Sequence, residues 1–95
     1  MNKQMVGDYI IYVEPSPFVS RTGKTDITIS RRSEWGRREP NGNLYAPCVK
    51  MAAEDYSVIG RDTFVPDAII DCAKMFYLEV EGEGQTCGHI SALRK

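Results

Sequence analysis

Alternating and continuous runs of apolar residues predict at least two strands in the first third of the chain. Residues 9–13 (YIIYV) are β-branched or aromatic, and Pro15 and Pro17 follow them. Because this run is apolar on both faces, we expect a central strand or one covered by a helix. Residues 25–30 (TDITIS) alternate polar and apolar, which is the period of a half-buried strand with Ile27 and Ile29 facing the core.

A hairpin is predicted after the second of these strands. If the strand continues beyond residue 30, Arg31, Ser33, Trp35 and Arg37 share its core-facing side. Asn41-Gly42 is a strong hairpin signal, and the returning strand would cover residue 44 to about residue 51. Pro47 inside that strand indicates an edge position or a bulge, because proline donates no ladder hydrogen bond.

The second half of the chain predicts one helix. A short strand is expected over residues 56–59, ending at Gly60, and a helix from Pro66 to about Tyr77. Apolar residues recur there at helical spacing: Ile69, Cys72, Ala73, Phe76 and Val80. Residues 76–81 also alternate as a strand would, so a short helix turning into a strand stays open, with a turn at 82–85 and a final strand at 86–93.

These elements predict an α+β fold, a small antiparallel sheet of three to five strands with one helix packed on a face. The chain has 95 residues, 42% of them hydrophobic and 26% charged, which fits a single globular domain over residues 1–95. No apolar run approaches the length of a membrane span and no secretory signal is recognisable, and three cysteines fit free thiols better than disulfides. We therefore expect a cytoplasmic protein, a monomer or homodimer, without a membrane partner.

Cysteine and histidine offer candidate chemistry. Cys48, Cys72, Cys87 and His89 could together form a Cys₃His zinc site, but no C-x₂-C knuckle is present. Cys87 and His89 could also form a nucleophilic pair, although no orienting Asn or Asp lies nearby. We expect instead small core cysteines and an exposed or capped histidine, and hence no enzyme, no metal and no cofactor.

Charge divides the chain more clearly than any motif does. Residues 1–50 carry eight basic and five acidic side chains, and residues 51–95 carry four basic and eight acidic ones. The positive part is concentrated between Arg21 and Arg38, and the negative part between Asp62 and Glu83. The two segments could face each other, which would make the pattern structural, or form separate docking surfaces.

The basic segment is the candidate binding site. Trp, Tyr and Arg are enriched at protein-binding hot spots, and arginines with an interleaved aromatic residue also suit phosphates and bases. The candidate residues are Arg31, Arg32, Trp35, Arg37, Arg38 and Tyr45.

Three functional interpretations follow from this segment and the cysteines. The first is a small non-enzymatic binding protein that docks on a larger protein or nucleoprotein, such as a phage- or mobile-element-encoded inhibitor of a bacterial defence complex of the anti-CRISPR type. The second is a nucleic-acid-binding module that uses the Arg/Trp-rich hairpin. The third is a small Cys/His zinc protein or enzyme.

Overall fold

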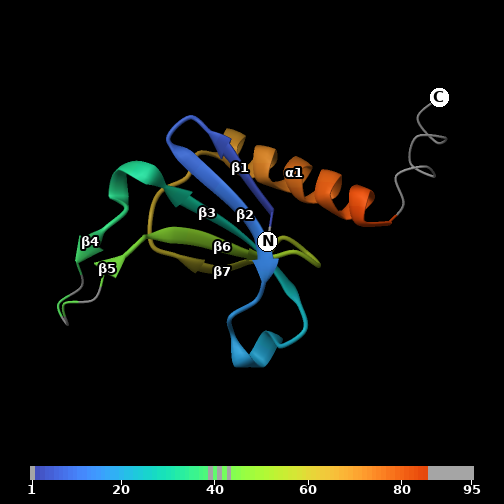
Figure 1. The fold of residues 1–95 in the computed structure, drawn as a ribbon, viewed down its shortest axis with the longest axis horizontal. Helices are drawn as coiled ribbons and strands as arrows, with labels where there is room; N and C mark the ends of the chain where they lie inside the picture. Colours follow the sequence, from blue (N-terminus) through green and yellow to red (C-terminus); the bar gives the residue numbers. More distant parts are fainter. Residues whose placement is uncertain (1, 39, 41, 43, 86–95) are drawn as a thin grey trace.

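The protein is an antiparallel sheet with one long helix packed across a face, as the computed structural model shows for residues 2–38, 40, 42 and 44–85 (Figure 1). The five strands of the sheet lie in the order β1-β2-β3-β6-β7. Their bounds are β1 Asn2–Val6, β2 Tyr9–Pro15, β3 Thr25–Arg31, β6 Cys48–Ala52 and β7 Val58–Arg61, and the helix α1 spans Asp67–Gln85. The predicted α+β class is therefore confirmed.

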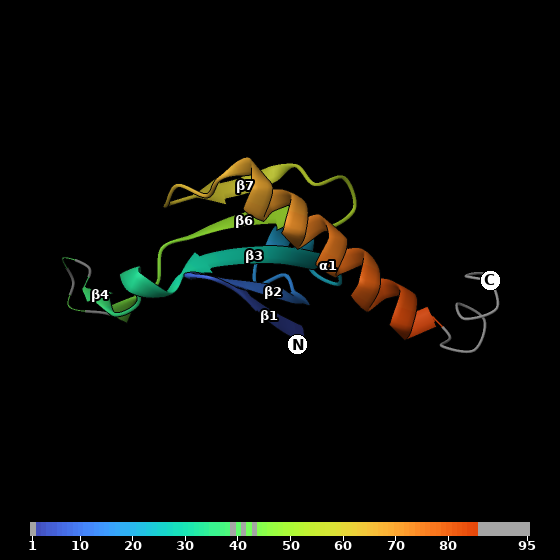
Figure 2. The ribbon, with the colours of Figure 1, turned by 90° about the horizontal axis from the view of Figure 1, so that it is seen from above.

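The core lies between this sheet and α1. Ile11 on β2 is opposite Ile29 on β3, and Ile29 is in turn opposite Val49 on β6, so apolar side chains form a row on one face. All three are fully buried, and Ala73 of α1 is buried in the same cluster. Figure 2 shows α1 lying diagonally over this face. The alternation of residues 25–30 thus predicted the core side of β3 correctly.

Helix α1 is longer than the sequence pattern indicated. It continues through residues 76–81 to Gln85, so the strand alternative is excluded and the turn expected at 82–85 is wrong. Phe76 and Tyr77 pack against the core from one helical face, which overrides the alternation in the same residues. The carbonyl of Pro66 accepts hydrogen bonds from the N–H groups of Ile69 and Ile70 and so begins the helix. The strand expected at 86–93 lies outside the described residues.

The first strand was not predicted. β1 pairs with β2 in unbroken register from Asn2 opposite Val13 to Val6 opposite Tyr9. Gly7, with φ of 59°, occupies the tight turn between them, and the next residue, Asp8, keeps a negative φ. Glycine first with positive φ is the pattern of a type II′ hairpin turn.

The two long strands of the predicted hairpin are each interrupted. β3 ends at Arg31, and a 3₁₀ turn, η2 (Arg32–Glu34), replaces the expected continuation through Trp35 and Arg37. The returning segment is divided into β5 (Leu44–Tyr45) and β6, with fully buried Pro47 just ahead of β6. β6 lies between β3 and β7, so it is a central strand and not the edge strand that Pro47 had indicated. Pro47 lies just outside the ladder, so its missing N–H removes none of the ladder's hydrogen bonds.

Candidate docking surface

The segment between β3 and β6 forms an arm outside the five-stranded sheet. β4 (Arg37–Arg38) pairs only with β5 in a separate two-stranded sheet, with Arg37 opposite Tyr45 and Arg38 opposite Leu44. Figure 1 shows this pair extending away from the end of β3 and the start of β6. We call residues 32–46 the arm. Gly36, with φ of 82°, allows the chain to leave η2 and enter β4.

Hydrogen bonds fix the base of the arm to the turn between β1 and β2. The Asp8 carboxylate accepts a 3.1 Å bond from the Ser33 N–H and a 2.6 Å bond from the Ser33 hydroxyl. The Asp8 carbonyl accepts a 2.7 Å bond from the Arg32 N–H. η2 is therefore held on the hairpin turn, and the arm starts from a defined position.

A second anchor joins η2 to the segment after β7. The Thr63 hydroxyl donates to the Glu34 carboxylate, at 2.9 Å from Oε1 and 3.1 Å from Oε2. Glu34 also receives a 3.2 Å bond from Arg31 Nη1. Two loops far apart in sequence thus meet at one carboxylate.

Arg31 is engaged within the chain. Besides Glu34, its Nε lies 3.8 Å from Asp8 Oδ2, and its guanidinium carbon lies 6.0 Å from the centre of the Tyr9 ring. The side chain is half-buried by these neighbours. Of the six predicted binding residues, Arg31 therefore has a clear structural role at the base of the arm.

The other predicted residues lie on the arm itself. Arg32 is exposed on η2 and forms no ion pair with any other described residue. The Trp35 side chain, directly after η2, is 48% exposed, which is high for the residue type most enriched at binding hot spots. The structure brings Arg37, Arg38 and Tyr45 together by their backbones in the β4–β5 pair.

Phe64 is an exposed aromatic residue that the sequence reasoning missed. It follows Thr63, so it stands beside the second anchor of the arm, and it is 68% exposed. An isolated phenylalanine before Val65 and Pro66 carries no sequence signal that separates it from a core residue. The Glu34–Thr63 contact, which depends on the fold, is what associates Phe64 with the base of the arm.

The basic and acidic segments of the sequence do not simply face each other. Arg21, the last residue of the 3₁₀ turn η1 (Val19–Arg21) after β2, pairs with Glu54 at 2.7 Å and with Asp26 at 2.8 Å. Its hydrogen bonds lower the pKa of Glu54 to about 2 and raise the pKa of Arg21 itself. Arg21 and Arg31 thus take their ion-pair partners outside residues 62–83.

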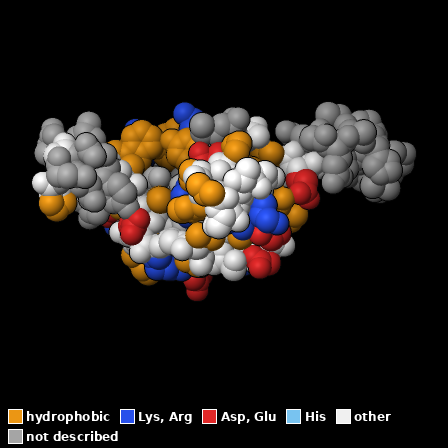
Figure 3. Space-filling view, turned by 90° about the horizontal axis from the view of Figure 1, so that it is seen from below, with side chains coloured by type: hydrophobic (Ala, Val, Ile, Leu, Met, Phe, Trp, Pro, Cys, Tyr) orange, Lys and Arg blue, Asp and Glu red, His pale blue; other side chains and the backbone are white. Residues whose placement is uncertain are grey.

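The face of the sheet away from α1 carries a second group of polar contacts. Lys50 on β6 donates to the Thr28 hydroxyl at 2.7 Å and to Glu14 Oε2 at 3.3 Å, and Thr28 donates to the same oxygen at 2.8 Å. On this face, hydrophobic side chains occur in separate groups among charged and polar ones (Figure 3). Glu14, Thr28 and Lys50 thus satisfy one another across β2, β3 and β6, which indicates a structural network.

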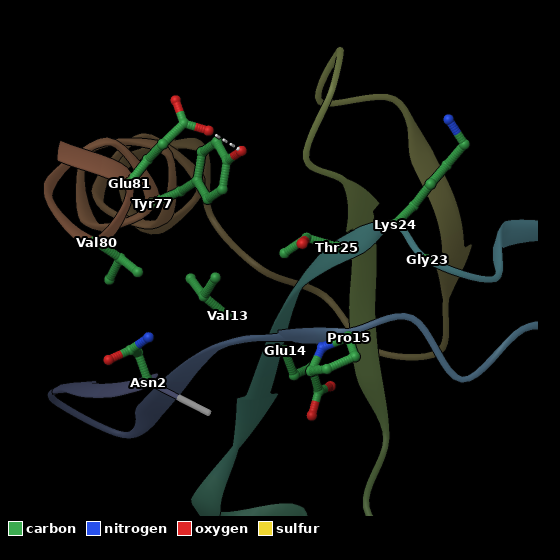
Figure 4. A pocket seen from close by; sticks show the side chains of 10 residues that line it. All are labelled: Asn2, Val13, Glu14, Pro15, Gly23, Lys24, Thr25, Tyr77, Val80 and Glu81. Atoms are coloured by element: carbon green, nitrogen blue, oxygen red, sulfur yellow. Dashed lines mark hydrogen bonds between the residues drawn. The ribbon is translucent and has the colours of Figure 1, made fainter. Parts of the chain in front are cut away.

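A hollow of about 460 Å³ lies between the C-terminal half of α1 and the ends of β1 and β2. Val13 and Val80 form part of its wall, and Asn2 and Thr25 lie at its sides (Figure 4). Tyr77 donates a 2.5 Å hydrogen bond to Glu81, which together with burial raises the Tyr77 pKa to about 12. Tyr77 is therefore neutral at ordinary pH and already has its acceptor within the helix.

The cysteines give no metal site within the described part of the chain, where no group of three or more candidate ligands occurs. Cys48 and Cys72 are half-buried free thiols, and burial raises the pKa of the Cys48 thiol. A raised pKa reduces the thiolate fraction, which makes Cys48 a poor nucleophile. Cys87 and His89 lie outside the described residues.

Comparison with known proteins identifies no family model, no curated protein and no solved structure that matches this chain.

Within the described residues, no helix is both long and apolar enough to cross a membrane.

Proposed function

We propose that this protein is a non-enzymatic binding module that docks on a larger protein or nucleoprotein through the arm. The observation that carries the proposal is the position of the arm. It lies outside the main sheet, is anchored at its base by Asp8 and Glu34, and combines arginines with half-exposed Trp35.

The anchored base favours binding without large rearrangement. A loop that must become ordered on binding loses conformational entropy, whereas a pre-positioned arm avoids much of that cost. Exposed Trp35 and Phe64 provide apolar area near the base, and Arg32 adds a positive charge with no ion-pair partner among the described residues. The partner surface that fits this chemistry is an acidic surface surrounding an apolar hollow.

A protein surface is a better match than a nucleic acid backbone for this arrangement. Arg31 makes contacts at the base that compete with phosphate binding, so it is not among the arginines free to neutralise phosphates. Protein interfaces use a few aromatic and arginine anchors, whereas nucleic acid affinity rises with the number of phosphates that are neutralised.

A more specific role is proposed from the small size of the chain and its projecting arm. It is the inhibition of a bacterial defence complex by a phage- or mobile-element-encoded protein of the anti-CRISPR type. Its test is the survival of a targeted plasmid in bacteria that carry an active CRISPR system, with and without this protein. Unchanged plasmid loss across the CRISPR types tested would exclude this role without excluding docking.

The experiment for docking compares two triple variants in affinity purification from bacterial cells. The arm variant carries Trp35→Ala, Arg37→Ser and Arg38→Ser. The control variant carries Val19→Ala, Lys24→Ser and Arg61→Ser, which removes one exposed apolar side chain and two exposed charges elsewhere. We expect the same partner to be retained by the wild type and the control and lost from the arm variant.

Nuclease treatment separates the two classes of partner. Retention that survives nuclease supports a protein partner. Retention that disappears with nuclease, together with salt-dependent binding in a gel-shift titration, supports nucleic acid instead. Equal retention by the arm variant and the wild type would overturn the proposal.

A further inference from the structure

β1 is the regular free edge of the five-stranded sheet. β7, the strand at the other end, pairs with β6 through a register shift between Lys50 and Met51. Irregularities of this kind bend an edge and oppose further pairing. β1 has no shift against β2, and in the described part of the chain no strand lies beyond it.

The hairpin turn determines which groups of β1 point outward. In a two-residue turn, the residues that flank it form a hydrogen-bonded pair, here Val6 and Tyr9. Bonded and non-bonded pairs then alternate along an antiparallel ladder, so Gln4 bonds to β2. The main-chain N–H and C=O groups of Lys3 and Met5 consequently point away from the sheet.

We propose that this edge pairs with β1 of a second copy of the chain, antiparallel and with the two-fold axis at Gln4. In this register Lys3 of each copy forms a hydrogen-bonded pair with Met5 of the other, so every outward group of both residues is used. Gln4 stands opposite Gln4 of the second copy. The inference concerns the edge of the main sheet and not the arm, and it does not depend on the proposed docking function.

Other self-pairings of the same edge are poorer. An axis at Lys3 would place Lys3 opposite itself, and like charges directly opposite are destabilising. An axis at Met5 would place Lys3 opposite Gly7, whose φ of 59° takes it out of the strand conformation. Only the axis at Gln4 aligns both outward residues with strand residues and avoids opposed charges.

Side chains favour the same register. Met5 is 50% exposed on the face away from α1, beside Ile10, its neighbour across the ladder. The aliphatic stem of Lys3 from the second copy would cover it, with the ammonium group in water. The strand has five residues, so the interface is small and we expect weak, concentration-dependent association.

Two substitutions at one position test this register by sedimentation equilibrium between about 10 µM and about 1 mM protein. Met5→Glu places a carboxylate opposite Lys3 of the second copy and should tighten dimerisation by about fivefold, whereas Met5→Lys opposes two cations and should weaken it about as much. Met5 is half-exposed on an edge strand, so both variants should retain the fold, which circular dichroism melting verifies. If the two-fold axis lay at Met5, position 5 would lie opposite itself, and both substitutions would weaken dimerisation equally. This result would overturn the proposed register.

Cross-linking gives a second, independent measurement. Gln4→Cys should form a disulfide between copies under mild oxidation, because opposite Cα atoms of a non-hydrogen-bonded pair lie about 4.5 Å apart. Lys3→Cys is the matched control, since Lys3 is not opposite itself, and oxidised wild type accounts for the native cysteines. Equal cross-linking of both variants would overturn self-pairing. A wild-type chain that stays monomeric at about 1 mM would also overturn it, and this is the result expected if the edge accepts a strand from a different protein.

Discussion

Arg21 and Glu54, which are 33 positions apart, form a two-point contact in which Nη1 lies 2.7 Å from Oε2 and Nη2 lies 3.0 Å from Oε1. Arg21 Nε also donates to buried Asp26 at 2.9 Å, and Nη2 donates to the Thr25 carbonyl. One guanidinium therefore joins the loop after β2, the start of β3 and the turn after β6. Its planar fork suits this arrangement, which a lysine could not reproduce.

Replacing Glu54 should change how stability depends on pH. The pKa of Glu54 is lowered from 4.5 to about 2 by Arg21, so the folded state favours the charged form. The stabilisation is complete above about pH 4.5 and is lost as the pH falls toward about 2. Urea unfolding should show wild type more stable than Glu54→Gln at neutral pH, with the two curves converging near pH 2. A constant difference across this range would contradict the assignment.

Tyr77 should titrate unusually late. Its hydrogen bond to Glu81 raises the pKa from 10.0 to about 12, and the contribution to stability is present below pH 10 and lost as the pH rises toward 12. Absorbance titration of Glu81→Gln should move one tyrosine back toward 10. Glu79→Gln, an exposed neighbour on the same helix, is the control and should leave the titration unchanged.

Shortening Ile29 should destabilise the protein strongly. Ile29 is fully buried between Ile11 and Val49, so Ile29→Ala leaves a cavity in the centre of the sheet and should cost about 3 kcal/mol of unfolding free energy. Val19→Ala, at a position 92% exposed, should change it by less than about 0.5 kcal/mol. If denaturant unfolding showed similar losses of unfolding free energy for Ile29→Ala and Val19→Ala, the core would not lie around Ile29.

Two glycines should respond differently to alanine. Gly7→Ala meets no atom within 4 Å, but φ is 59° there, and this backbone strain should cost about 1–3 kcal/mol. Gly60 also has open space and lacks a positive φ, so Gly60→Ala should have little effect. Comparable unfolding free energies for the two variants would argue against the type II′ turn.

The sequence predicted those elements in which burial of one face makes apolar residues recur at a regular spacing. Ile27 and Ile29 alternate because one face of β3 meets α1, and the apolar spacing of α1 arises from the same contact. β1 escaped detection because an edge strand with exposed residues needs no apolar alternation. The glycines at 82 and 84 suggested a turn, yet glycine weakens a helix by only about 1 kcal/mol relative to alanine.

The candidate site was predictable in composition but not in arrangement. Arginines and tryptophan identified the arm, whereas the separate roles of Arg31 and Arg32 depend on where Asp8 and Glu34 lie after folding. Phe64 joined the base of the arm only through the Thr63–Glu34 contact. Contacts between distant segments follow from register, which local patterns do not contain.

The separate β4–β5 pair divides the chain into a part that maintains the fold and a part free to vary. β4 and β5 pair with each other outside the five-stranded sheet, and the anchors at Asp8 and Glu34 precede both short strands. The segment 37–45 can therefore change in sequence, and even in length, at little cost to folding, since longer surface loops add closure entropy only slowly. The same scaffold could carry a different recognition tip, so variation in binding need not be limited by stability.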